Sequence, residues 1–141
     1  MRLLYSLSIA ISMYSKIPVP MVDWNEKNMK YAMCFFPVVG VITGLLQAGA
    51  GYLILQYTSF GKLFFAAVMT LIPVLVTGGI HLDGYADTID ALSSYGDREK
   101  KLQILKDPHT GAFAVIGLCV YFAAALALWS EADVRMLPLT A

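Results

Sequence analysis

Three aspartates stand at helical spacing in the segment GGIHLDGYADTIDAL, residues 78–92, namely Asp83, Asp87 and Asp90. In a helix with about 100° per residue, their carboxylates share a stripe about 60° wide. Carboxylates on one stripe repel one another, and ionised groups beside an apolar segment are costly to dehydrate. A divalent cation would remove both penalties. The spacing therefore predicts a metal site formed by these three side chains.

The donor set favours one group of cations. Carboxylates without thiolate or imidazole partners suit Mg²⁺, Mn²⁺ or Ca²⁺ rather than zinc, and D-G-x-x-D-x-x-D is not the ligand spacing of an EF-hand. Mg²⁺ commonly combines a few carboxylates with water and substrate phosphate. Gly84 leaves room for a phosphate group, and positive charge follows from Arg98, Lys100, Lys101 and Lys106. We expect Mg²⁺ here and phosphoryl-transfer chemistry.

Each of these features has a structural alternative. The three acids could form a solvated helix face, and His81 could be a packing or hydrogen-bonding residue. The basic residues could anchor the chain to lipid headgroups and fix its topology.

The rest of the chain supplies the frame for this segment. Of its 141 residues 58% are hydrophobic and only 14% are charged, a balance typical of proteins in lipid. Three stretches free of charged residues are near or above the roughly 18 to 20 residues that span hydrocarbon: 31–57, 63–80 and 111–130. We therefore predict an all-α polytopic integral membrane protein, residues 1–141 forming one membrane domain. A net charge of +0 excludes a basic nucleic-acid-binding surface as the main feature.

Two other segments complete the expected architecture. The N-terminal apolar stretch is short and ends at Pro18 and Pro20, which predicts a helix at or partly within the membrane interface, with a fourth crossing as the alternative. Residues 81–110 form a polar insert, in which Asp97 is expected to cap a helix from Arg98 to Leu105. With three crossings, eight of the ten basic residues fall on the side of the insert, so the positive-inside rule places it in the cytoplasm, at the inner membrane.

Small residues and proline suggest how the spans pack. The pair Gly40 and Gly44 could permit close helix approach. Pro73 and the pair 78–79 predict a kink or break just before His81. Two cysteines within apolar runs are expected to be buried thiols that pack as small hydrophobic groups: Cys34 and Cys119.

The segments HLDGYADTIDAL and DREKKLQILKDPHTGAFAVIG resemble the cobalamin synthase family, the adenosylcobinamide-GDP ribazoletransferases. That family's pattern is G-G-x-H-x-D-G-x-x-D-x-x-D-[GA], followed by an R-E-x block and K-D-x-x-x-G-[AP]-F. Its opening R-[IL]-P-V-P is similar to Lys16-Ile-Pro-Val-Pro, where lysine replaces the usual arginine. The resemblance covers residues 1 to about 128.

The resemblance implies a Mg²⁺-dependent transfer. A hydroxyl of α-ribazole or its 5′-phosphate would attack adenosylcobinamide-GDP, giving adenosylcobalamin or its phosphate and releasing GMP. Asp83, Asp87 and Asp90 would hold the metal, with Asp87 or Asp90 as the general base. The remaining matched positions are expected to bind or orient the substrate: His81, Gly84, Arg98, Lys106 and Asp107.

Family members are roughly three-quarters longer, so we expect a truncated member whose missing half could come from another copy or a separate chain. Other interpretations stay open at this point. A CDP-alcohol phosphotransferase also uses an acidic motif at a membrane surface, but its motif reads D-G-x-x-A-R. The other open interpretation is a transport-type or non-catalytic membrane fragment with a divalent-cation site.

Overall fold

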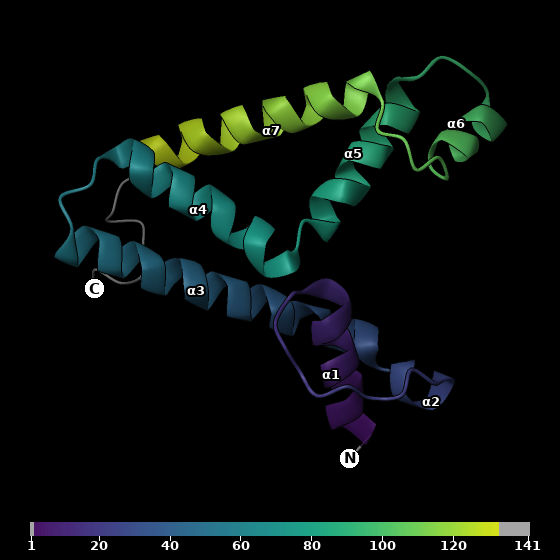
Figure 1. Cartoon of the computed structure of the whole chain (residues 1–141), viewed down its shortest axis with the longest axis horizontal. Coiled ribbons are helices and arrows are strands. Elements are labelled where there is room, and N and C mark those ends of the chain that lie inside the picture. Colours follow the sequence, from purple (N-terminus) through teal and green to yellow (C-terminus); the bar gives the residue numbers. More distant parts are fainter. Residues whose placement is uncertain (1, 133–141) are drawn as a thin grey trace.

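The computed structural model describes residues 2–132, which fold into helices joined by turns, with no strand among them (Figure 1). In chain order these are α1 (Arg2–Tyr14), α2 (Glu26–Met29), the 3₁₀ helix η1 (Ala32–Phe35), α3 (Phe36–Tyr57), α4 (Lys62–Thr77), α5 (Ile80–Ser93), α6 (Arg98–Ile104) and α7 (Ala112–Glu131). The predicted all-α class is confirmed.

Two helical segments are long and apolar enough to cross a membrane, Glu26–Tyr57 and Ala112–Glu131. The helix α4 has 16 residues and is therefore about 24 Å long, short of the roughly 30 Å of a hydrocarbon core. It counts as part of a third span only if α4 and α5 are taken together as one bent span. The structure thus supports a polytopic membrane protein with two or three spans. The expected second span, 63–80, ends earlier than predicted, at Thr77.

The early end of α4 has a local cause. Gly78 and Gly79 adopt φ angles of 65° and 80°, in the left-handed region that glycine enters without steric cost. Both donate their backbone N–H to the carbonyl of Val74, which terminates the helix. The axis then turns by 94° into α5. The predicted break before His81 is confirmed.

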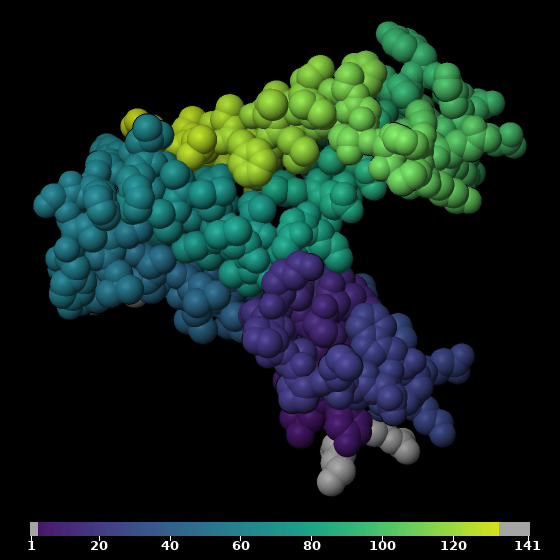
Figure 2. All heavy atoms as spheres, viewed as in Figure 1, coloured from purple at the N-terminus to yellow at the C-terminus, as the bar shows by residue number. Residues whose placement is uncertain are grey.

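The helix α7 lies along both α4 and α5, and α3 packs against α4 (Figure 1). The turn between α3 and α4 stands at one end of the molecule. The N-terminal helices and the polar insert with α6 stand at the opposite end, as two separate projections (Figure 2). The sequence therefore places its polar segments at one end of an apolar helical frame.

Two glycines, Gly51 and Gly117, allow close packing of helices, and both lie outside the predicted pair Gly40 and Gly44. A Cβ at Gly51 would lie 3.1 Å from Met69, and one at Gly117 would lie 2.6 Å from Ile89. Gly40 and Gly44 have no such neighbour within 4 Å, so the expected close approach at this pair does not occur within residues 2–132. The cysteines also differ from expectation, because Cys34 and Cys119 are both exposed rather than buried.

The N-terminal unit has its own small core, formed by Ile9, Ala10 and Ala32. The helix α1 has 13 residues, about 20 Å, which is too short to cross hydrocarbon. Its interfacial position stays a prediction. Elsewhere many large apolar side chains are exposed; for example, Leu75 is 70% exposed and Leu128 is 74% exposed. Lipid or further protein must cover such faces.

Candidate active site

The predicted helix that carries the acidic stripe is present as α5, and its apolar face packs on α7. Ala86 is buried, Ile89 lies against Gly117, and the rings of Tyr85 and Tyr121 are 5.9 Å apart. Of the three aspartates on this helix, Asp83 and Asp87 are exposed and Asp90 is partly buried. The helical stripe therefore forms, but its members do not share one environment.

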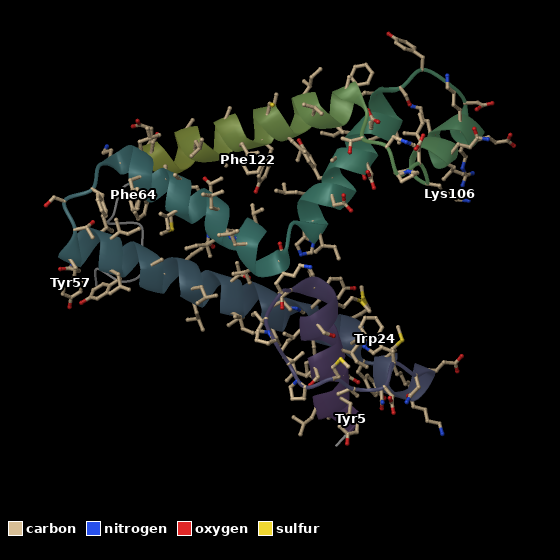
Figure 3. All side chains as sticks on the ribbon, in the orientation of Figure 1. Tyr5, Trp24, Tyr57, Phe64, Lys106 and Phe122 are labelled. Atoms are coloured by element: carbon tan, nitrogen blue, oxygen red, sulfur yellow. The ribbon has the colours of Figure 1, made fainter. Side chains whose placement is uncertain are left out.

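A cavity of about 540 Å³ lies where the end of α1 meets the α4–α5 bend. Asp83 and Asp87 line it, and Lys16 is its basic residue. Phe122 contributes to its wall from the inner side of α7 (Figure 3). Hydroxyl groups come from Ser12, Ser15, Thr77 and Thr110. Two carboxylates, one ammonium group and several hydroxyls thus border one space.

The position of Lys16 depends on the bend. Its backbone N–H donates to the carbonyl of Val76 at 2.8 Å, which joins the end of α1 to the end of α4. Its aliphatic side chain lies over Gly78, where a Cβ would collide with it. The glycine therefore has two roles, since it turns the chain and leaves space for the lysine.

The N-terminus of α5 opens on the same cavity. Gly78, Gly79 and Ile80 line it, and the N-cap residue Gly79 provides no side chain to cap the first N–H groups. Unpaired N–H groups at a helix N-terminus attract anions. Asp83 lies in this first turn, where the helix dipole stabilises a carboxylate by about 0.3–1 kcal/mol. The cavity thus combines a site suited to anions with two carboxylates suited to a cation.

Asp90 faces a different neighbour. Its carboxylate occupies the space beside Gly111 that a Cβ would need, and Gly111 is the N-cap of α7. Asp90 does not line the cavity. The tertiary structure therefore separates Asp90 from Asp83 and Asp87, although all three share a stripe.

His81 and Gly84 also lie outside the cavity lining. The His81 ring stacks on Tyr14 at a centroid distance of 6.4 Å and meets Phe36 edge-on at 5.5 Å. This agrees with the packing alternative for His81. Gly84 is exposed, and no side chain stands within 4 Å of where its Cβ would be. The substrate-binding roles expected for His81 and Gly84 stay predictions.

The helix α6 begins as expected, because the Asp97 side chain accepts a hydrogen bond from the backbone N–H of Lys100 at 3.0 Å. Arg98 and Lys106 are exposed and do not line the cavity. Figure 3 shows Lys106 at the outer edge of the insert. The structure does not bring these two basic side chains to Asp83 and Asp87.

Asp107 is paired with His109. Its Oδ1 accepts the backbone N–H of His109 at 3.0 Å and lies 2.6 Å from the ring Nδ1. The backbone hydrogen bond, followed by the side-chain hydrogen bond, lowers the pKa of Asp107 from its ordinary value. Asp107 is therefore an ionised, exposed carboxylate whose nearest partner is an imidazole.

The donor geometry bears on a metal ion. Within residues 2–132, no three His, Cys, Asp or Glu side chains are grouped closely enough to hold one. Asp83 and Asp87, one helical turn apart and in one cavity, form a two-carboxylate set. Mg²⁺ is often held by one or two carboxylates together with water and substrate phosphates. The residues present fit such a shared site but not a cage made of protein ligands alone.

Sequence reasoning did not assign three groups near the cavity: Lys16, Thr110 and His109. A signal existed for Lys16, which opens the K-I-P-V-P motif. No pattern in the sequence indicates that this motif meets the α4–α5 bend, which is a tertiary contact.

A family model described as cobalamin-5-phosphate synthase matches residues 6–141. The chain belongs to the cobalamin-5-phosphate synthase family. Similar curated proteins are named adenosylcobinamide-GDP ribazoletransferase. One from Lachnoclostridium phytofermentans is 53% identical, covering 86% of this chain and 46% of that protein. One from Clostridium botulinum is 39% identical (86% and 48%), and one from Chlorobium phaeobacteroides is 44% identical (82% and 45%).

The chain spans about half the length of the curated relatives it matches. No solved structure matches it. Family membership confirms the resemblance carried by the acidic block and the K-D-P segment, in preference to a CDP-alcohol phosphotransferase. The roles of individual residues remain predictions.

Proposed function

We propose that this chain forms the diphosphate-binding part of an adenosylcobinamide-GDP ribazoletransferase, which joins adenosylcobinamide-GDP to α-ribazole or its 5′-phosphate and releases GMP. The observation that carries the proposal is the single cavity at the α4–α5 bend. Asp83, Asp87, Lys16 and the uncapped start of α5 all border it. The substrates follow from the name given to the relatives.

In this proposal the two sides of the cavity bind opposite charges. Lys16 and the N–H groups at the start of α5 hold phosphate oxygens by charge-assisted hydrogen bonds. Asp83 and Asp87 hold Mg²⁺, which when bound offsets the charge of the diphosphate and of the departing GMP. Asp90 positions α5 against the start of α7. Proximity and orientation of the diphosphate are then the main contribution of this chain's residues.

The membrane arrangement follows from the ends of the molecule. The N-terminal segments and the insert carry most of the basic residues and lie at the end opposite the α3–α4 turn (Figure 1). We propose that this end faces the cytoplasm, at the inner membrane. The apolar faces of α3 and α7 would be covered by lipid together with a second copy of this chain.

The proposal is tested by turnover in liposomes. The chain is reconstituted with adenosylcobinamide-GDP, α-ribazole and Mg²⁺, and GMP is measured. Asp83→Asn and Asp87→Asn should each reduce the rate by at least about 10²-fold, the scale of losing a main electrostatic contact. The matched control is Asp23→Asn, the same change at an exposed aspartate in the loop before α2. Absence of GMP, or equal rates in all variants, would refute the proposal.

A further inference from the structure

The loop between α6 and α7 contains an aspartate–histidine pair with defined geometry. Asp107 Oδ1 lies 2.6 Å from His109 Nδ1 and accepts the His109 backbone N–H at 3.0 Å. An ionised carboxylate can only accept hydrogen bonds, so the ring hydrogen is assigned to Nδ1. His109 Nε2 then keeps its lone pair. The His109 side chain is 89% exposed, so this nitrogen can meet a substrate.

The same loop runs along the acidic face of α5. Thr110, the residue after His109, lines the cavity together with Asp83 and Asp87. The next residue, Gly111, touches the Asp90 carboxylate. Along the chain, His109 is therefore next to a residue of the cavity wall, Thr110, and two positions before Gly111, which contacts the acidic stripe.

The reaction requires a proton acceptor, and the carboxylates of the stripe are poorly suited to that role. Asp83 and Asp87 would be occupied as ligands of the proposed dication. Asp90 lies against Gly111 and does not line the cavity. An imidazole titrates near neutral pH, the range in which a general base is most effective. The chain's other histidine, His81, lies against the rings of Tyr14 and Phe36 and outside the cavity lining.

We infer that His109 is the general base of the proposed transfer and that Asp107 is its positioning residue. This inference rests on the proposed function. His109 Nε2 takes the proton of the attacking ribazole hydroxyl, and the hydroxyl oxygen forms a bond to the phosphorus bonded to the cobinamide oxygen. The bond between that phosphorus and the bridging oxygen breaks, and its electron pair leaves on the phosphate of GMP. The imidazolium then loses its proton to water.

The electrostatics of the pair support this assignment. The lowered pKa of Asp107 keeps its carboxylate ionised, and an ionised carboxylate stabilises the imidazolium that forms. Among the described residues, Asp107 is the acid whose oxygen lies within ion-pair distance of the His109 ring. The other charged groups bordering this loop are Lys106, which precedes Asp107, and Asp90, which contacts Gly111.

The test is the pH dependence of kcat for GMP release by the full chain in liposomes. His109→Gln should lower kcat by about 10²–10⁴-fold and remove the acidic limb of the profile. Asp107→Asn should keep that limb and lower kcat with little change in KM, because the ring loses the hydrogen bond that orients it. Added imidazole should raise the rate of His109→Ala severalfold. Glu99→Gln, in the exposed part of α6, is the matched control and should keep the unaltered profile.

The outcomes separate this inference from the proposed function. No GMP from the unaltered chain contradicts the proposed function and the base assignment together. Turnover by the unaltered chain with an unchanged profile in His109→Gln contradicts the base assignment alone. A slow His109→Gln that retains the acidic limb, or a His109→Ala that imidazole does not rescue, gives His109 a structural role and also overturns it.

Discussion

The contact between Gly117 and Ile89 holds the acidic helix against α7, so an alanine at position 117 should weaken the frame of the site. The added Cβ would stand 2.6 Å from Ile89 Cδ1 and 3.2 Å from Cγ2, inside the ordinary separation of about 3.5–4 Å. Ile89 is β-branched and lies in a helix, where one χ1 rotamer dominates, so Cγ2 cannot turn away and only Cδ1 can move, by rotation about χ2. Overpacking of this kind costs about 1–3 kcal/mol.

Part of that cost is offset, because replacing glycine by alanine in a helix gains about 0.4–1 kcal/mol. The expected net effect of Gly117→Ala is a loss of up to about 2.6 kcal/mol in the free energy of unfolding. The matched control is Gly40→Ala in α3, which meets nothing within 4 Å and should show only the gain. Ile89→Val removes Cδ1 and should recover stability in the Gly117→Ala background, with a coupling energy of about 0.5–3 kcal/mol.

Unfolding is followed by SDS titration in mild detergent, using helical circular dichroism and Trp129 fluorescence in a Trp24→Phe background. Trp129 lies on α7 with its ring centroid 6.3 Å from that of Phe65 on α4, so its emission reports the docking of α7. If Gly117→Ala stabilises the chain as much as Gly40→Ala does, or if Ile89→Val gives no recovery, the packing of α5 on α7 is not as described.

Three further outcomes are expected. Gly111→Ala places a Cβ on the Asp90 carboxylate and should lower stability by about 1–3 kcal/mol in the same titration, with recovery when Asp90→Ala is added. Gly78→Ala should lower stability by more than about 1 kcal/mol, because φ is 65° and the Cβ would strike Lys16, while Gly84→Ala should not. The pKa of Asp107 in the folded chain is lower than the ordinary aspartate pKa of 3.8. Its hydrogen bond with His109 is therefore fully present above pH 3.8 and is lost as the pH falls through the pKa of the folded chain. The His109 amide resonance should report that acid transition, and Asp107→Asn should abolish it.

Features with a local cause could be predicted from the sequence. The span of α7, the Asp97 cap of α6 and the break at Gly78 depend on composition and on residues a few positions apart. The helical stripe of aspartates belongs to this group, since periodicity alone fixes angles around one axis.

What faces each side chain could not be predicted in the same way. Lys16 reaches Gly78 from another helix, and Asp90 meets Gly111 only because α7 packs along α5. The exposure of Cys34 and Cys119 has the same origin, because an apolar run indicates an apolar surrounding without saying whether protein or lipid provides it. At the Gly40 and Gly44 pair, an added Cβ would meet no atom within 4 Å among residues 2–132.

The central claim is that Asp83 and Asp87 together hold a dication that binds a diphosphate. Its most direct test is calorimetric titration of Mg²⁺ into the detergent-solubilised chain in the presence of GDP. We expect Asp83→Asn and Asp87→Asn each to weaken Mg²⁺ binding by at least about tenfold, or 1.4 kcal/mol, and Asp90→Asn to leave it within about threefold. Unchanged affinity in the first two variants, or an equal loss in all three, would contradict the account.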